Sequence, residues 1–153
     1  MRPAIVAVLI GAAVFSGVYL LTLRPPATPE VARDRAASAA SGGVQRDQGE
    51  GGVEIEVTYG GPQTAPYEPD RYTVFLVAFT THSVDLSRYD MVQVSELRAG
   101  GRTLRPLRWV STSDDSHHRS GALIFPQVAP GQPIELAIKT IAGVAVRTYR
   151  WTP

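Results

Sequence analysis

The three histidines of the chain, with the carboxylates near them, are the side chains best suited to chemistry. Neutral imidazole is the commonest protein ligand of divalent copper and zinc, and a neighbouring carboxylate fixes its tautomer. All three histidines fall in two polar segments, residues 80–90 and 111–121. If these segments converge in the fold, their imidazoles and carboxylates would form a copper or zinc site. The candidate metal ligands are His82, Asp85, Asp114, His117 and His118.

The same polar groups have a second interpretation, in which they serve the fold. Serine, threonine and aspartate side chains commonly bond to one another and cap strand ends. Adjacent residues of an extended chain point in opposite directions, so His117 and His118 need a turn between them to bind one ion. The ligand spacing matches no known metal-site template. We therefore expect no resident cofactor and keep a copper or zinc site as the alternative.

Other reactive chemistry is excluded or poorly supported. The chain has no cysteine, which excludes disulfides, thiolate metal sites and cysteine nucleophiles. A serine nucleophile lacks the G-x-S-x-G turn, and the neighbours Ser116 and His117 are not expected to give hydroxyl-to-base geometry. We predict that the protein is not an enzyme. Residues 53–153 carry ten basic and ten acidic side chains, so the domain lacks the positive charge of a nucleic-acid binder.

Four arginines form a local basic patch on one predicted hairpin. They are Arg98, Arg102, Arg105 and Arg108. Such a patch could meet anionic lipid headgroups or an acidic partner. The alternative, favoured by the neutral charge of the whole domain, is a solvated sheet edge whose charge discourages aggregation.

The elements that must position the polar segments have the two-residue period of β-strands. Residues 53–59 alternate apolar and polar side chains, and residues 72–80 are apolar on both faces, which predicts a strand at the centre of a packed assembly. Pro106 interrupts residues 102–110, so that arm should be an edge strand or carry a bulge. The seven predicted strands are 53–59, 72–80, 91–97, 102–110, 121–125, 134–140 and 144–151. This pattern predicts an all-β, seven-stranded sandwich of immunoglobulin or fibronectin-III type, with a cupredoxin-like sandwich as the alternative.

A membrane segment is predicted near the start of the chain. Residues 4–23 carry no charge and are bounded by Arg2 and Arg24. A helix of that length spans about 30 Å, the thickness of the bilayer hydrocarbon. Signal peptides have shorter apolar regions followed by a small-residue cleavage site, so an uncleaved signal-anchor is favoured over a cleaved signal. We expect residues 4–23 to cross the cell membrane once as a transmembrane helix.

Three parts follow from these patterns. Residues 1–24 are the anchor, residues 25–52 are a disordered linker with few large apolar side chains, and residues 53–153 are the β-sandwich domain. Basic residues after the apolar run would keep the domain in the cytoplasm. A short tail, an apolar segment, a linker and an all-β domain are nevertheless the usual layout of an exported domain. We therefore expect the domain on the extracytoplasmic, periplasmic side.

Three segments carry a resemblance to a known group of domains. They are FLVAFTTHSVDLSRYD (75–90), LRPLRW (104–109) and HHRSGALIF (117–125). On these, the domain resembles uncharacterised exported or membrane-anchored β-sandwich domains of bacteria and archaea, which have T-H-S-x-D-L and H-H-R-x-G segments. The resemblance implies a fold but no activity. We expect a membrane-tethered module that binds an extracytoplasmic protein or ligand, and the alternative is a copper- or zinc-handling protein.

Overall fold

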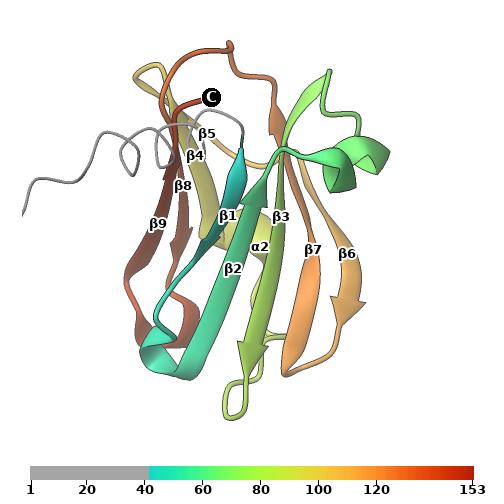
Figure 1. Ribbon diagram of the computed structural model, residues 1–153. Helices are drawn as coiled ribbons and strands as arrows, with labels where there is room; N and C mark the ends of the chain where they lie inside the picture. Colours follow the sequence, from blue (N-terminus) through green and yellow to red (C-terminus); the bar gives the residue numbers. More distant parts are fainter. Residues whose placement is uncertain (1–41) are drawn as a thin grey trace, which may run out of the picture.

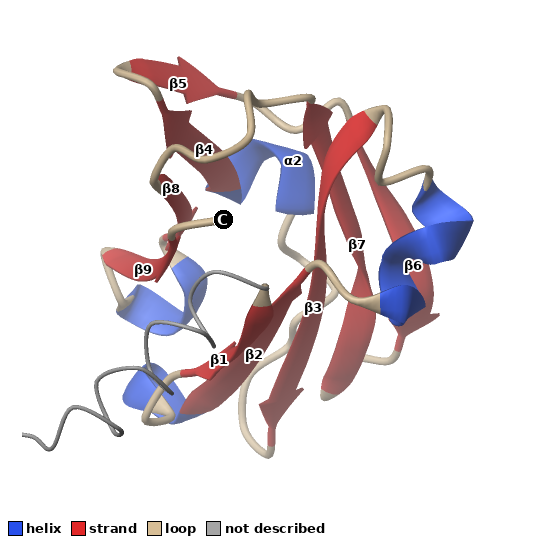
Figure 2. Cartoon of the chain, turned by 45° about the horizontal axis from the view of Figure 1, so that its top comes forward, coloured by secondary structure: helices blue, strands red, loops and turns tan. Residues whose placement is uncertain are grey.

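Two antiparallel β-sheets form residues 42–153, the part of the chain that the computed structural model describes (Figures 1 and 2). One sheet has, in spatial order, β1 (Gly43–Arg46), β2 (Val53–Tyr59), β3 (Tyr72–Thr81), β7 (His118–Pro126) and β6 (Arg108–Asp114). The other has β5 (Arg102–Leu104), β4 (Ser95–Ala99), β8 (Ile134–Lys139) and β9 (Val146–Trp151). Short helical turns are η1 (Glu50–Gly52), η2 (Pro62–Tyr67), α2 (Met91–Val94) and η3 (Ile141–Gly143).

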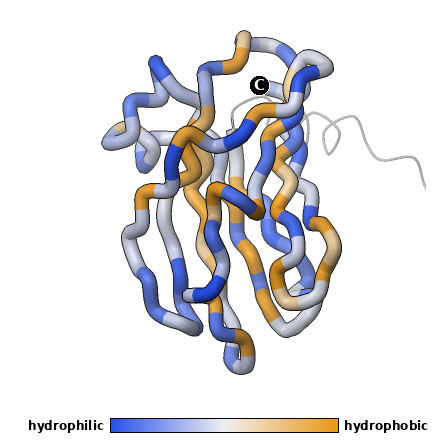
Figure 3. Tube along the Cα trace, turned by 180° about the vertical axis from the view of Figure 1, so that it is seen from behind, coloured by the Kyte–Doolittle hydropathy of each residue, from blue (hydrophilic) through white to orange (hydrophobic). Residues whose placement is uncertain are grey.

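The inner faces of the two sheets enclose the main apolar core. Side chains alternate along a strand, so every second residue of β2, β3 and β7 faces this core, and the hydropathy of the chain alternates accordingly (Figure 3). Four aromatic rings form a group within this core, toward the end of the sandwich where β2 and β9 end, and neighbouring rings in the group have centroids 5.2 to 5.8 Å apart: Tyr59, Phe75, Phe125 and Trp151. The all-β sandwich predicted from the sequence is confirmed.

The predicted central strand, residues 72–80, is the middle strand of the five-stranded sheet. Its inner residues Phe75, Val77 and Phe79 lie in the main core. On its outer face Val74 packs with Ala122 and Ile124 of β7 in a second apolar cluster, which Tyr67 of η2 partly covers. Both faces of β3 are therefore in packed surroundings, which explains why both are apolar.

Two predicted strands have the wrong bounds. Residues 91–97 begin with the helical turn α2, because the Asp90 carboxylate accepts the N–H groups of Val92 and Gln93 and so caps a helix. Residues 102–110 form two strands, one on each side of Pro106: β5 in the four-stranded sheet and β6 in the five-stranded sheet. Each is an edge strand of its sheet, as the proline predicted. Strand β6 also continues to Asp114, so most of the predicted polar loop 111–121 is a hairpin.

The predicted linker, residues 25–52, includes a strand. Residues 43–46 form β1, which pairs antiparallel with β2, so the domain begins before residue 53. The pattern hid this strand because its only large apolar side chain, Val44, is exposed. Residues 25–41 and the apolar run 4–23 lie outside the described residues. Within residues 42–153, no helix has the length and apolar character needed to cross a bilayer.

A buried ion pair ties the segment after β1 to β9 in the opposite sheet. Arg147 Nε lies 2.8 Å from Asp47 Oδ2, and the two side chains are 3% and 14% exposed. Arg147 also donates to the backbone carbonyls of Ile141 and Glu50, and Asp47 accepts two backbone N–H groups. Because burying an unpaired charge costs several kcal/mol, each side chain depends on the other.

We expect Arg147→Met to lower the free energy of unfolding by about 3–5 kcal/mol, because Asp47 would stay buried without a counter-charge. Urea unfolding followed by tryptophan fluorescence measures this. The matched control is Arg150→Met on the same strand, whose arginine pairs with Glu135 but is 69% exposed, and it should cost far less. Equal losses in the two variants would contradict the structural role of the buried pair.

Candidate functional site

The two polar segments meet at one end of the sandwich, which is the condition on which the copper or zinc hypothesis depends. The N–H of Thr81 donates to the carbonyl of His117 at 3.0 Å, and the N–H of Leu86 donates to Ser116 at 2.8 Å. We call residues 82–90 and 114–118 together the loop end. In Figure 1 the loop end lies at the bottom, while the start of β1 and the C-terminus lie at the top.

Arg119 of β7 holds the loop end together. Its Nη1 donates to the carbonyls of Leu86 at 3.0 Å and Tyr89 at 2.6 Å, and its Nε lies 3.1 Å from Asp114 Oδ1. The side chain is 12% exposed and its guanidinium lies 5.8 Å from the centre of the Trp109 ring. Loop carbonyls have no strand partner, and the rigid fork of a guanidinium satisfies several at once.

Arg119 stands in the H-H-R segment, but it was not among the candidate functional residues predicted from the sequence. The available signal was its position in β7. Residues 121, 123 and 125 lie on the same inward face of β7 and are buried. Arg119 continues this row of uncharged residues with a charged side chain. A charged residue at such a position must bond to something nearby.

The exit from β3 is fixed by a second side chain. The hydroxyl of Thr81 donates to the carbonyl of Gly52 in η1 at 2.7 Å. The same oxygen accepts the N–H groups of Ser83 and Val84 at 3.2 and 3.3 Å. Three hydrogen bonds to one hydroxyl turn the chain sharply after β3 and attach residues 82–90 to the neighbouring turn η1.

The carboxylates of the loop end build local turns. Asp85 accepts the N–H and the hydroxyl of Ser87 at 3.0 and 2.6 Å, and the bond from the Ser87 hydroxyl lowers the pKa of Asp85. Asp115 accepts the N–H groups of His117 and His118 at 2.8 and 3.0 Å, which lowers the pKa of Asp115. Both aspartates therefore stay ionised in mildly acidic solution.

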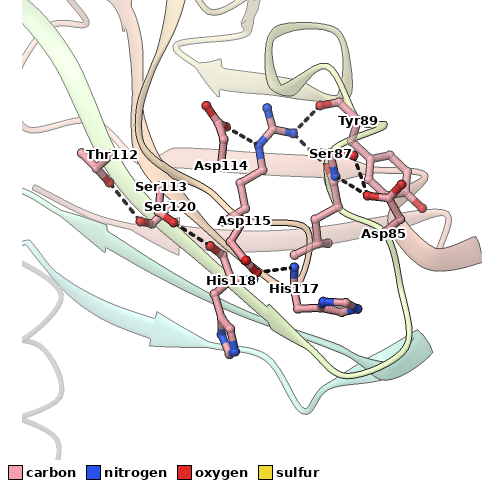
Figure 4. A network of polar contacts seen from close by, with 12 residues as sticks. Asp85, Ser87, Tyr89, Thr112, Ser113, Asp114, Asp115, His117, His118 and Ser120 are labelled. Carbon is pink, nitrogen blue, oxygen red and sulfur yellow. Dashed lines mark hydrogen bonds and ion pairs between the residues drawn. The ribbon is translucent and has the colours of Figure 1, made fainter.

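The three histidines are exposed. His118 lies opposite Thr80 in the pairing of β3 with β7, and Figure 4 shows its ring pointing away from that of His117. Ser116 Oγ lies 3.1 Å from His117 Nδ1, so the expectation that these neighbours would not reach hydrogen-bonding distance is wrong. Catalysis also needs a group that orients the base, and the carboxylates of Asp85 and Asp115 are engaged with Ser87 and backbone N–H groups.

Two of the predicted carboxylate ligands have other partners. Asp85 accepts hydrogen bonds from the N–H and the hydroxyl of Ser87. Asp114 is ion-paired with Arg119 instead. Among residues 42–153, no three histidine, aspartate or glutamate side chains gather as a group able to hold a metal ion, whereas zinc sites use three or four protein ligands. The copper or zinc site remains a prediction.

The charge of the loop end is negative. Residues 82–90 and 114–118 contain four aspartates and one arginine, a net formal charge of −3 with neutral histidines. Arg119 beneath them offsets Asp114. The exposed surface of the loop end therefore offers carboxylate, hydroxyl and imidazole groups in a geometry fixed by hydrogen bonds.

Comparison with known proteins adds no relative. No family model, curated protein or solved structure matches this chain. The resemblance to exported domains, based on the T-H-S-x-D-L and H-H-R-x-G segments, therefore stays a prediction. The structure gives these segments a role in the fold, because Thr81 and Arg119 hold the loop end in place.

We expect Arg119→Met to loosen the loop end, because the carbonyls of Leu86 and Tyr89 lose their donor. Amide hydrogen exchange in residues 82–90 should accelerate, and the free energy of unfolding should fall by about 1–3 kcal/mol. Arg119→Lys should rescue little, since one ammonium cannot reproduce the guanidinium fork. Arg88→Met, an exposed change in the same segment, is the control. Unchanged exchange in Arg119→Met would refute the clamp.

We expect copper and zinc titration by calorimetry to give only weak binding, because the histidines and carboxylates approach at most in pairs. The comparison variants are His82→Ala, His117→Ala and His118→Ala. Tight one-to-one binding that disappears with His82→Ala and with a change in one of the adjacent pair would contradict this expectation and establish the metal site.

Proposed function

We propose that the protein is a single-pass membrane protein whose β-sandwich lies outside the cytoplasm and binds a partner through the loop end. The observation that carries the proposal is the position of the loop end, which lies opposite the point where the chain enters the domain (Figure 1). The apolar run at residues 4–23, bounded by arginines, supports a signal-anchor.

The separation of the two ends supports this orientation. Strand β3 has ten residues, and a strand rises about 3.3 Å per residue, so roughly 33 Å separate its two ends. Gly42 and Pro153 line one hollow together with Tyr59 and Tyr72, so both ends of the domain lie at the end of β3 away from the loop end. A domain attached through Gly42 would present the loop end away from the bilayer.

The construction of the loop end also suits recognition. Binding residues commonly stand on loops held by a rigid scaffold, because ordering a loop on binding costs affinity. Arg119 and Thr81 hold these loops by at least three bonds to backbone groups, while Asp85, Asp115 and His117 remain exposed. The negative charge favours a partner protein with a basic surface.

We further propose that the sandwich is of the immunoglobulin or fibronectin-III type. Its support is the pair of antiparallel sheets packed around one core, an arrangement that such domains use to present loops at one end. The structure has nine strands in the described residues instead of the seven expected. The additions arise from β1 and from the division of one expected strand at Pro106.

The proposal is tested with the full chain in membranes. We expect it to resist extraction by alkaline wash and its domain to be digested by protease added outside intact spheroplasts. A photo-cross-linking residue at position 117 should then capture a basic partner, whereas one at Gln127, exposed at the opposite end, should not. Release of the chain by the wash, protection from external protease, or equal capture at both positions would contradict the proposal.

A further inference from the structure

We propose that the crossover between the two sheets, residues 102–108, docks the domain on an anionic phospholipid surface. This inference rests on the membrane tether proposed above. The crossover comprises β5, the break at Pro106 and the first residue of β6.

Within residues 42–153, the crossover holds most of the arginines that lack an ion pair. Residues 42–153 contain eleven basic residues, and seven of these make ion pairs in the described structure. The four others are Arg88, Arg102, Arg105 and Arg108. Three of the four therefore lie within seven consecutive residues, although Arg98 on the preceding strand is paired with two glutamates.

An exposed apolar side chain lies among these cations. The side chain of Leu107 is 55% exposed. Only three large apolar side chains of residues 42–153 are exposed, and Leu107 is one of them. Arg105 donates to the carbonyl of Gln93 at 2.9 Å, and Arg108 lies over the ring of Tyr72 at 5.4 Å. Leu107 stands between these two arginines in the chain, and neither guanidinium group has an acidic partner in the described residues. An apolar side chain between cations fits the headgroup region of an anionic bilayer.

The crossover lies at the end of the sandwich that a membrane anchor would bring to the bilayer. The N–H of Leu107 donates to the carbonyl of Ile124 at 2.7 Å, near the end of β7. Figures 1 and 2 show β5 and the start of β6 on the side of the C-terminus, away from the loop end. The basic crossover and the loop end with its charge of −3 thus mark opposite ends, and an anionic surface would attract one and repel the other.

The tether makes a weak lipid contact sufficient. Residues 24–41 separate the apolar run from Gly42, and a chain of this length reaches at most about 60 Å. A domain held so near a bilayer experiences a high effective concentration of headgroups. For the same reason the favoured anionic surface is lipid, since a separate acidic protein lacks this advantage.

The test uses the full chain in vesicles, with a fluorophore on a single cysteine. The chain has no cysteine of its own, so Thr103→Cys labels the crossover and Gln48→Cys labels the opposite end; both native residues are exposed. The readout is quenching by headgroup spin labels in phosphatidylglycerol–phosphatidylcholine vesicles and in phosphatidylcholine vesicles. We expect stronger quenching at position 103 than at position 48, and only with phosphatidylglycerol.

A matched pair of charge reversals completes the test. The double variant Arg102→Glu, Arg108→Glu should lower the fraction of docked domains at least about tenfold. The quenching at position 103 should fall accordingly. Arg88→Glu should leave it unchanged; Arg88 also lacks an ion pair and lies over a tyrosine ring, at 5.0 Å, but stands at the loop end. Should the double variant fold poorly, high salt should abolish the quenching of the unmodified crossover, because it screens such contacts.

The outcomes separate this inference from the proposed function. Equal quenching at the two positions, quenching that ignores phosphatidylglycerol, or quenching that survives both charge reversal and high salt would overturn the docking surface while leaving the tether intact. Failure of the full chain to remain in vesicles after alkaline wash would overturn the proposed function, and the docking surface with it.

Discussion

The ion pair between Arg147 and Asp47 is the interaction on which the rest of the domain depends. It joins the chain just after its first strand to the last strand of the opposite sheet, so the two sheets are attached at the edge where β1 lies beside β9. Side-chain bonds along this edge, from Trp151 to Gly43 and between Gln45 and Arg150, extend the same closure. Because apolar contacts are non-directional, such polar bonds help to determine how the sheets are aligned.

The same chemistry recurs at the loop end. Arg119, like Arg147, is a largely buried arginine that faces one aspartate and donates to backbone carbonyls of a segment outside the sheets. A neutral side chain could fill the space but could not bond to these carbonyls, and lysine has a different geometry. Two guanidinium groups thus order the irregular segments at the bottom of the sandwich. These buried arginines fix the backbone of the loop end and thereby the positions of its exposed side chains.

Much of the sheet arrangement could be predicted from local pattern, because alternation in residues 53–59 and 72–80 reports directly which face is buried. Convergence of the two polar segments was left open by the sequence, because it depends on the pairing of β3 with β7, which the local pattern does not reveal. The division at Pro106 was only partly accessible, because proline marks an interruption without saying that the chain changes sheets. Strand β1 was hidden because a glycine and one exposed valine carry no periodic signal. The role of Arg119 depends on carbonyls that no sequence pattern reveals.

Strand β6 has a consequence for crowded surroundings. It is an outer strand of the larger sheet, and its pairing with β7 shifts between Ser111 and Ser113, so that Thr112 is an extra residue in the ladder. A bulge of this kind twists an edge and interrupts the regular row of N–H and C=O groups that another strand would need. If the proposed anchor confines copies to one membrane plane, they would collide often, and an irregular edge would keep them from joining strand to strand. Many molecules could then share a small area of bilayer and remain separate.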